Sequence, residues 1–278
     1  MSNLFSGLDE LGLGKLTKLD VYEEEKEAKD KETSKEKPEV IEEDLIFDKG
    51  YSCPVCDKEF KSKSVKAGRI KLDSMDTDLR PKYNLLDPLK YDAIVCYHCG
   101  YGALNRFFNY VTHRQAKLIK ENISSSFEGL DEEEGPYSYD YAIIRHKLAL
   151  ANSIVKKSKV SERAYTCLKT AWVIRGKREA LPKDTQNYRK KVKALFREEL
   201  QFTINAYEGF KEAYSTESFP MCGMDENTVV LLVAELARRV GKRDESARWI
   251  SQVLVSRDAN ERIKDRAREI RDLLQKSK

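Results

Sequence analysis

Apolar residues recur at helical spacing through the second half of the chain, from Tyr139 onward. A recurrence every three to four residues is typical of α-helices with one buried face. The pattern predicts helices near residues 139–157, 160–178, 187–215, 225–240, 243–256 and 259–276. Asp184 or Thr185 is expected to cap the third helix and Asp225 the fourth. Because the connections are short, neighbouring helices should pack as antiparallel hairpins.

Two of these predicted hairpins resemble tetratricopeptide units, in which small residues let two helices approach and large residues fill the groove between them. The matching positions are Leu148, Ala151, Ala164, Leu168 and Ala171 in the first hairpin and Leu231, Ala234, Ala247 and Leu254, with Gly241 at the turn, in the second. The match is degenerate. It therefore predicts a stack of repeat-like α-hairpins over residues 139–278 rather than a strict repeat.

Short apolar runs replace the helical period over residues 45–121. Residues 45–47 with Tyr51 predict a strand, and residues 60–72 predict a hairpin. Ile94 and Val95 predict another short strand, and the glycines at 100 and 102 predict a tight turn. A helix is expected over residues 103–120 because its apolar residues fall at helical spacing. The fold class expected is therefore mainly α, with a small α+β module at residues 45–121.

The remaining segments are polar. Residues 122–138 contain a run of three serines, an acidic cluster and Gly135-Pro136, so they predict a linker between two domains. Residues 1–44 begin with scattered leucines and Phe5, and continue as a Glu/Lys-rich stretch with almost no apolar residues. Such a composition predicts a disordered acidic tether. The apolar positions within residues 1–19 are consistent with either a docking peptide or a frayed terminus.

Charge is unevenly distributed along the chain. The net charge is +4, but residues 20–44 carry 12 acidic residues and 5 lysines. The chain from residue 45 onward therefore carries a net positive charge. Such a charge is compatible with an acidic partner without requiring one. No apolar run reaches the roughly 18 residues of a membrane span, and no secretory signal begins the chain. A cytoplasmic location with reduced cysteines is expected.

Four cysteines suggest a metal site. Cys53 and Cys56 form one Cys-x-x-Cys pair, and Cys96 and Cys99 form a second. Two such pairs can place four thiolates around one ion, which is the arrangement of a tetrahedral structural zinc site. We expect one structural Zn²⁺ in a zinc-ribbon-like module. A full shell of four thiolates leaves no open position for water or substrate.

Three alternatives to this zinc site are less consistent with the sequence. A rubredoxin-like iron site uses similar pairs, but its second pair commonly has proline where Tyr97 stands. A thioredoxin-like redox pair needs a βαβ setting that the pattern lacks. His98 lies inside the second pair and is expected to face solvent or the outer surroundings of the site. Cys167 and Cys222 are expected to act as small buried hydrophobes.

The densest polar cluster in the module lies between the two cysteine pairs, in residues 73–83. Asp76 and Asp78 could bind a hard cation or organise a loop, and Arg80 could pair with either of them. A turn whose aspartates accept backbone N–H groups is the favoured interpretation. Nothing nearby supplies a nucleophile with a base, so catalysis is disfavoured and no catalytic residue is predicted.

A second candidate surface is basic. Residues 155–200 hold 14 Lys and Arg against 5 Asp and Glu. Basic helices of this kind can contact nucleic-acid phosphates, although a solvated helix face is the commoner explanation. The candidate contacts are Lys156, Lys157, Lys159, Arg175, Lys177, Arg178, Arg189, Lys190, Lys191 and Lys193.

Several motifs together resemble the bacterial domain of unknown function 2225. They are Cys53-Pro-Val-Cys56 followed by Asp57-Lys-Glu-Phe60, the run Asp76-Thr-Asp-Leu-Arg-Pro81, and Tyr91-Asp92 ahead of Cys96-Tyr-His-Cys-Gly-Tyr101. The resemblance covers roughly residues 45–255. It implies a bacterial cytoplasmic protein, often of clostridia-like Firmicutes, and no established biochemical activity.

The expected function is a non-enzymatic protein-interaction adaptor, in which a stack of helical hairpins holds a protein or peptide partner and the zinc module is a rigid attached head. The alternative is a nucleic-acid-binding protein that uses the zinc ribbon and the basic helices. Neither reading involves a membrane.

Overall fold

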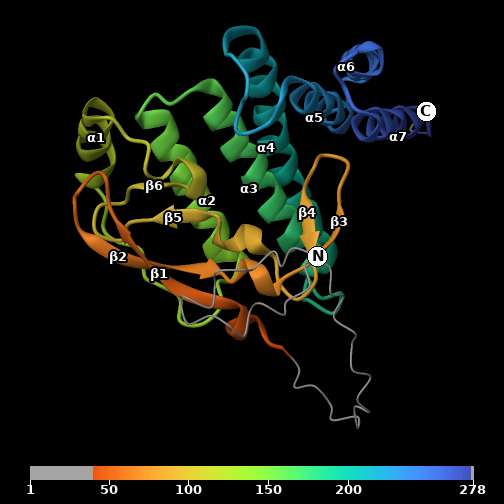
Figure 1. Ribbon diagram of the computed structural model, residues 1–278. Helices are drawn as coiled ribbons and strands as arrows, with labels where there is room; N and C mark the ends of the chain where they lie inside the picture. Colours follow the sequence, from red (N-terminus) through yellow and green to blue (C-terminus); the bar gives the residue numbers. More distant parts are fainter. Residues whose placement is uncertain (1–39, 277–278) are drawn as a thin grey trace, which may run out of the picture. The chain divides into compact units, whose positions relative to one another are not determined.

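Three antiparallel hairpins precede the helices in residues 40–276, the part of the chain that the computed structural model describes (Figure 1). Each hairpin is a separate two-stranded sheet. The strands are β1 (Ile46–Ser52) with β2 (Glu59–Val65), β3 (Leu72–Met75) with β4 (Pro81–Tyr83), and β5 (Ala93–Val95) with β6 (Gly102–Leu104). The candidate docking motif in residues 1–19, and residues 20–39 of the predicted tether, lie outside this part of the chain.

The helices confirm the expected fold class, mainly α with a small α+β module. They are α1 (His113–Ile119), α2 (Tyr139–Val155), α3 (Val160–Ala180), α4 (Tyr188–Thr216), α5 (Glu226–Arg239), α6 (Arg243–Val255) and α7 (Glu261–Lys276). The Asp225 side chain caps α5 by accepting a hydrogen bond from the Thr228 N–H, as predicted. The expected cap of α4 is wrong. Asn187, with a left-handed φ of 59°, precedes α4 and makes no side-chain cap.

The predicted helix over residues 103–120 is also wrong. Residues 102–104 instead form β6, because they pair with β5 across the second cysteine turn. The helix begins only at His113, where Thr112 and Gln115 form a reciprocal capping box. Likewise, β2 pairs with β1 across the first cysteine turn, and Leu72 belongs to the separate β3–β4 hairpin.

Residues near the predicted domain boundaries contact the rest of the described chain. Residues 42–45, at the end of the predicted tether, form a 3-10 turn in which Glu42 contacts Lys90 and Tyr91. In the predicted linker, Tyr137 is buried and its ring stacks on that of Tyr91.

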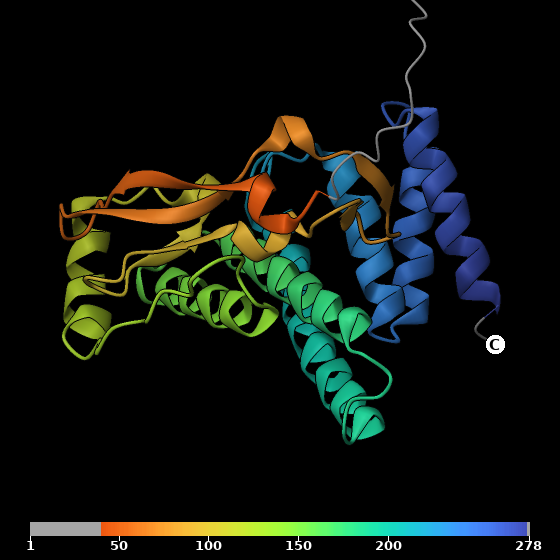
Figure 2. The ribbon, with the colours of Figure 1, turned by 90° about the horizontal axis from the view of Figure 1, so that it is seen from below.

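The β1–β2 and β5–β6 hairpins lie against α2. Its Arg145 side chain is buried and joins them, since it donates hydrogen bonds to the Ser62 hydroxyl on β2 and to the Ala93 carbonyl on β5. Figure 2 shows the β1–β2 and β5–β6 hairpins beside this helix. The Asn152 amide of α2 also donates to the carbonyl of Gly100 in the second cysteine turn.

The helices share two apolar cores. One involves α2, α3, α4 and α5, and the other lies between α5, α6 and α7. Helix α5 belongs to both cores, and its residues 229–237 are buried without interruption. A helix that is apolar on all sides needs such a central position. In the tetratricopeptide-like pattern, Ala164, Leu168 and Ala171 are buried as expected, but Ala151 and Ala247 are exposed. The stack of repeat-like α-hairpins therefore stays a prediction.

Helices α3 and α4 approach closely at Gly209. A Cβ atom at this position would lie 2.8 Å from the Ala164 Cβ. Val at Gly209 must therefore separate the helices, and we expect Gly209→Val to lower the free energy of unfolding by about 1–3 kcal/mol in urea denaturation. Gly50→Val in β1 is the matched control, because a Cβ there has no neighbour within 4 Å. Equal effects of the two substitutions would contradict this packing.

Candidate metal centre and a buried carboxylate–arginine network

The four cysteines of the two predicted pairs come together. Their sulfur atoms all lie within 4.8 Å of one another, so they could hold a metal ion. The Sγ atoms of Cys53 and Cys99 are 3.6 Å apart, and those of Cys56 and Cys96 are 3.7 Å apart. Four thiolates at about 2.3 Å from one tetrahedral ion would be spaced by roughly 3.8 Å. The cluster therefore has the dimensions of such a site.

The two cysteine turns have the same backbone geometry. In the first, Asp57 N–H donates to the Cys53 carbonyl, and in the second Gly100 N–H donates to the Cys96 carbonyl, each at 2.9 Å. Asp57 and Gly100 are both left-handed, with φ of 60° and 71°. Glycine and aspartate are among the residues that tolerate this conformation. The chain thus presents each sulfur pair on an equivalent tight turn.

Apolar side chains surround the cluster. Cys53, Cys96 and Cys99 are buried in a core that includes Phe60, Tyr101, Phe108, Val55 and Ile94. Hydrogen bonds from the Cys53 and Cys99 thiols lower the pKa of Cys96 to about 4. The buried setting leaves little access for a substrate, and it favours a structural role for a bound ion.

His98, Cys167 and Cys222, which the sequence analysis also considered, do not belong to the cluster. His98 is exposed, and its Nε2 lies 3.3 Å from the Glu59 carbonyl. Cys167 is buried in the helical core, where burial raises the pKa of its thiol to about 12. Cys222 lies near Ser161 at the start of α3. These side chains take no part in the four-cysteine cluster.

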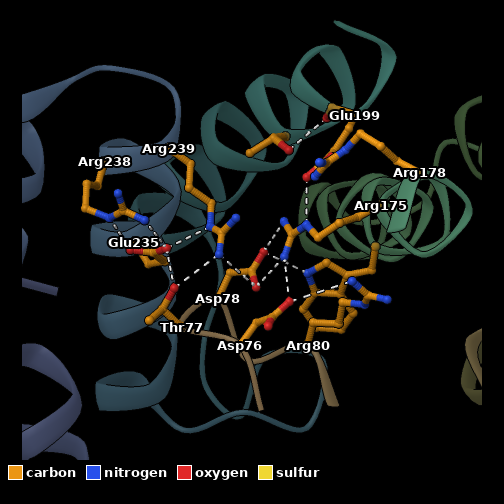
Figure 3. Close-up of polar contacts among 12 residues, drawn as sticks. Asp76, Thr77, Asp78, Arg80, Arg175, Arg178, Glu199, Glu235, Arg238 and Arg239 are labelled. Atoms are coloured by element: carbon orange, nitrogen blue, oxygen red, sulfur yellow. Dashed lines mark hydrogen bonds and ion pairs between the residues drawn. The ribbon is translucent and has the colours of Figure 1, made fainter. Parts of the chain in front are cut away.

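The polar cluster at residues 76–80 forms the tip of the β3–β4 hairpin. Hydrogen bonds and ion pairs connect this tip to three helices (Figure 3). Asp78 is completely buried. Its carboxylate accepts two hydrogen bonds from Arg175 of α3, at 2.6 and 3.0 Å, and one from the Trp172 indole at 3.1 Å. Asp76 also accepts from Arg175, at 3.0 Å, and pairs with Lys82. Two aspartates from one hairpin therefore share one guanidinium.

Further partners extend this contact to α4 and α5. Arg175 donates to Glu199 of α4 at 2.7 Å, and Thr77 donates to Glu235 of α5 at 2.6 Å. Arg239 pairs with Glu235. Arg80 pairs with Glu179 at 2.8 Å. We call this set the Asp78–Arg175 network. Its members are Asp76, Thr77, Asp78, Arg80, Arg175, Glu199, Glu235 and Arg239.

The contact between Asp78 and Arg175 shifts the pKa of both side chains. Burial by itself would raise the pKa of Asp78, but the charge and hydrogen bonds of Arg175 outweigh burial and lower it below its usual value. The pKa of Arg175 is raised in turn, chiefly by Asp78, despite its own burial. The favoured interpretation, a turn whose aspartates accept backbone N–H groups, is therefore wrong in its donors. Within residues 40–276, Asp76 and Asp78 are instead held by the side chains of Arg175, Trp172 and Lys82.

A pocket of about 500 Å³ lies against the same hairpin tip. We call it the hairpin pocket. It is lined by Met75, Leu79, Pro81, Tyr165, Leu168, Lys169, Trp172, Met224, Asp225, Thr228, Leu231, Leu232, Asn260, Arg262, Ile263 and Arg266. Leu79 adopts a left-handed φ of 68°, which is uncommon for leucine. The network holds the residues on either side of it, and Leu79 packs against both helical cores.

A second buried charged group borders this pocket. Lys169 pairs with Asp92 at 3.0 Å, and its ammonium lies over the rings of Tyr165 and Trp172. Nearby, burial lowers the pKa of His146 to about 4. The His146 Nδ1 lies 2.8 Å from the Ala142 carbonyl, which fits a neutral ring that donates from Nδ1. Within residues 40–276, its Nε2 atom has no hydrogen-bond partner.

The basic residues proposed for nucleic-acid contact do not form one surface. Lys156 and Arg175 are buried and pair with Glu162 and Asp78, so this part of the prediction is wrong. Lys177 pairs with Asp140 and Arg178 with Glu199. The exposed remainder is Lys157 and Lys159 before α3, and Arg189, Lys190, Lys191 and Lys193 at the start of α4. Helix α3 has 21 residues and separates the two groups by about 30 Å.

Three members of the Asp78–Arg175 network were not predicted from the sequence, namely Arg175 as an ion-pair partner, Glu199 and Glu235. A signal existed for two of them. Glu235 interrupts the apolar run of α5, and Arg175 follows the apolar residues 171–174 of α3. A charged residue inside an apolar helical run is seldom buried without a partner. Glu199, in the polar sequence of α4, carries no comparable signal.

The chain was compared with known proteins. A family model described as an uncharacterised protein conserved in bacteria, DUF2225, matches residues 46–274. Neither a curated protein nor a solved structure matches the chain. None of the helices in residues 40–276 is both long and apolar enough to cross a membrane.

The buried ion pair predicts a pH-dependent contribution to stability. Asp78→Asn leaves the Arg175 guanidinium without its closest charged partner, so we expect the free energy of unfolding to fall by about 3 kcal/mol at pH 7. The folded-state pKa of Asp78 lies below its unfolded value of about 3.9. The stabilisation is therefore present above that value and is lost as the pH falls through the folded-state pKa.

Urea denaturation of both proteins at a series of pH values, followed by tryptophan fluorescence, measures this difference. Asp48→Asn is the control, because Asp48 belongs to an exposed pair with Lys63 and should change stability by less than about 1 kcal/mol. A difference between wild type and Asp78→Asn that stays constant down to acid pH would rule out the charged pair as its source.

Proposed function

We propose, from the premise that this chain belongs to the DUF2225 family of uncharacterised bacterial proteins, that it is a non-enzymatic protein-interaction adaptor. In this proposal one structural zinc ion fixes the cysteine turns, and the helices with the β3–β4 hairpin bind a partner. The observation that carries the proposal is the hairpin pocket, whose walls come from the hairpin, α3, α5 and α7.

The lining of this pocket favours binding over chemistry. Trp172, Leu168, Leu231 and Leu232 are apolar residues of the core that also line the pocket. Partner surfaces are commonly bound by apolar and aromatic anchors of this kind. Of the ionisable groups at the pocket, Lys169 pairs with Asp92 and Asp225 caps α5, and groups held in this way position an element better than they transfer protons.

Zinc is the ion that we assign to the cysteine cluster. The donor set is four sulfurs on two tight turns, which suits zinc and leaves no coordination position for a substrate. Zinc would supply no reaction step. It would hold β1–β2 and β5–β6 together where two-stranded hairpins alone have little stability.

Metal analysis tests this assignment directly. We expect about one zinc per chain in the purified full-length protein, and loss of that zinc in Cys96→Ser because three thiolates and a hydroxyl bind it more weakly. The midpoint of thermal unfolding should fall with it, since structural zinc contributes folding free energy. Cys222→Ser is the control, because Cys222 lies outside the cluster and should leave the zinc content unchanged. Iron in place of zinc, or equal zinc content in both variants, would overturn the assignment.

Site-specific crosslinking in the native bacterium tests the adaptor function. A photoreactive phenylalanine at Ile263 places the probe at the hairpin pocket, and the same residue at Tyr110 places it on an exposed site outside the pocket lining. We expect a discrete protein crosslink from position 263 that survives nuclease treatment and is absent from position 110. Crosslinks to nucleic acid, or no difference between the two positions, would contradict the adaptor function.

A further inference from the structure

We propose that the hairpin pocket binds an acidic peptide segment that carries a bulky apolar side chain as its anchor. This inference rests on the proposed adaptor function and specifies the chemistry of the partner. The anchor would lie against Trp172, Met75 and Met224, and the peptide's carboxylates would lie near Arg262 and Arg266.

The size and lining of the pocket fit such an anchor. A volume of about 500 Å³ falls within the range of sites that enclose large apolar groups. Met75 and Met224 lie among its lining residues together with Trp172. Thioether side chains are flexible and polarisable, so they can adapt to an inserted aromatic or branched side chain.

The charges that line the pocket favour an acidic occupant. Lys169, Arg262 and Arg266 are cationic, and Asp225 is the only carboxylate among the lining residues. Asp225 is already engaged, because its side chain accepts a hydrogen bond from the Thr228 N–H at the start of α5. Lys169 is neutralised by Asp92. The two arginines of α7 outnumber the single carboxylate of Asp225, so the net charge that the lining offers a ligand is positive.

These two arginines differ from their neighbours on the same helix. Within residues 40–276, neither Arg262 nor Arg266 forms an ion pair, whereas Arg268 pairs with Asp265 and Glu261. Arg262 and Arg266 are four residues apart, so they share one face of α7 and repel each other. An anion between them would relieve that repulsion and form charge-assisted hydrogen bonds with both guanidinium groups.

The adjoining surface favours an extended chain over a compact molecule. A second pocket of about 270 Å³ shares Pro81 and Lys169 with the hairpin pocket, and it continues past Tyr83 and Asn105. An extended peptide can occupy both pockets at once. Thr228 and Asn260 at the hairpin pocket add polar groups that can pair with its main chain.

A peptide array provides the test. The array carries short sequences of Asp and Glu around a central Trp, Phe or Leu, together with versions in which the acids become amides and versions in which the anchor becomes Gly. Full-length zinc-loaded protein is applied, and binding sequences are measured again in solution by fluorescence anisotropy. We expect the acidic anchored peptides to bind, and both altered versions to bind at least about tenfold more weakly.

Variants of α7 locate the binding. Arg262→Glu with Arg266→Glu should weaken the acidic peptides by about tenfold or more, and lysine-containing peptides with the same anchor should bind this variant instead. The helix should still fold, because acidic residues near the N-terminus of α7 suit the helix dipole. Arg268→Glu is the matched control on the same helix, outside the pocket lining, and should bind the acidic peptides as wild type does.

Each outcome separates this inference from the adaptor function. Equal binding of acidic and amide peptides, or no effect of the double charge reversal, would overturn the acidic partner while a crosslink from position 263 still supported an adaptor. Saturable binding of a small anionic amphiphile such as laurate, without any peptide, would overturn the peptide. Absence of both peptide binding and a crosslink would overturn the two proposals together.

Discussion

The ion pair between Asp78 and Arg175 determines where the β3–β4 hairpin lies. A two-stranded hairpin with strands of four and three residues has almost no stability alone. Here its tip is held by a buried guanidinium that reaches two aspartates of the hairpin and Glu199 of α4. Each of the three nitrogens of that guanidinium donates to a carboxylate oxygen. A buried charge is tolerated only with such complete pairing, so the pair fixes position more than it adds stability.

The cysteine cluster and the Asp78–Arg175 network both hold small two-stranded sheets in place, by different interactions. The β1–β2 and β5–β6 hairpins are separate two-stranded sheets, and the four cysteines join their turns at one point. The β3–β4 hairpin has no cysteine, and ion pairs attach it to the helices instead. Arg145 and Asn152 of α2 then join the cysteine turns to the helical core. Polar and sulfur contacts thus connect small sheets to a larger apolar core.

The sequence predicts the helical half of this structure far better than the other half. Apolar periodicity places the six helices from residue 139 onward to within two residues at each end, because each has a long face that must be buried. Strands of three residues carry no comparable pattern, so β6 was mistaken for part of a helix. The cysteine cluster was predictable because its spacing is local. The partnership of Asp78 with Arg175 was not, since it joins residues 97 positions apart in a way that no local pattern encodes.

The β3–β4 hairpin forms one wall of the hairpin pocket, and its buried contacts hold that wall in place. Leu79 is held in a left-handed conformation, and such backbone strain persists only where the surroundings determine it. Asp78 and Arg80 on either side of Leu79 are both buried and ion-paired, so this wall of the pocket is formed before any partner arrives. A preformed wall lowers the entropy lost on binding. Another wall, α7, carries Arg262 and Arg266, which form no ion pair within residues 40–276. Both lie near the N-terminus of α7, where the dipole of their own helix disfavours cations. The pocket thus combines a preformed apolar wall with two arginines that lie in an unfavourable electrostatic setting. An acidic partner would stabilise such a surface.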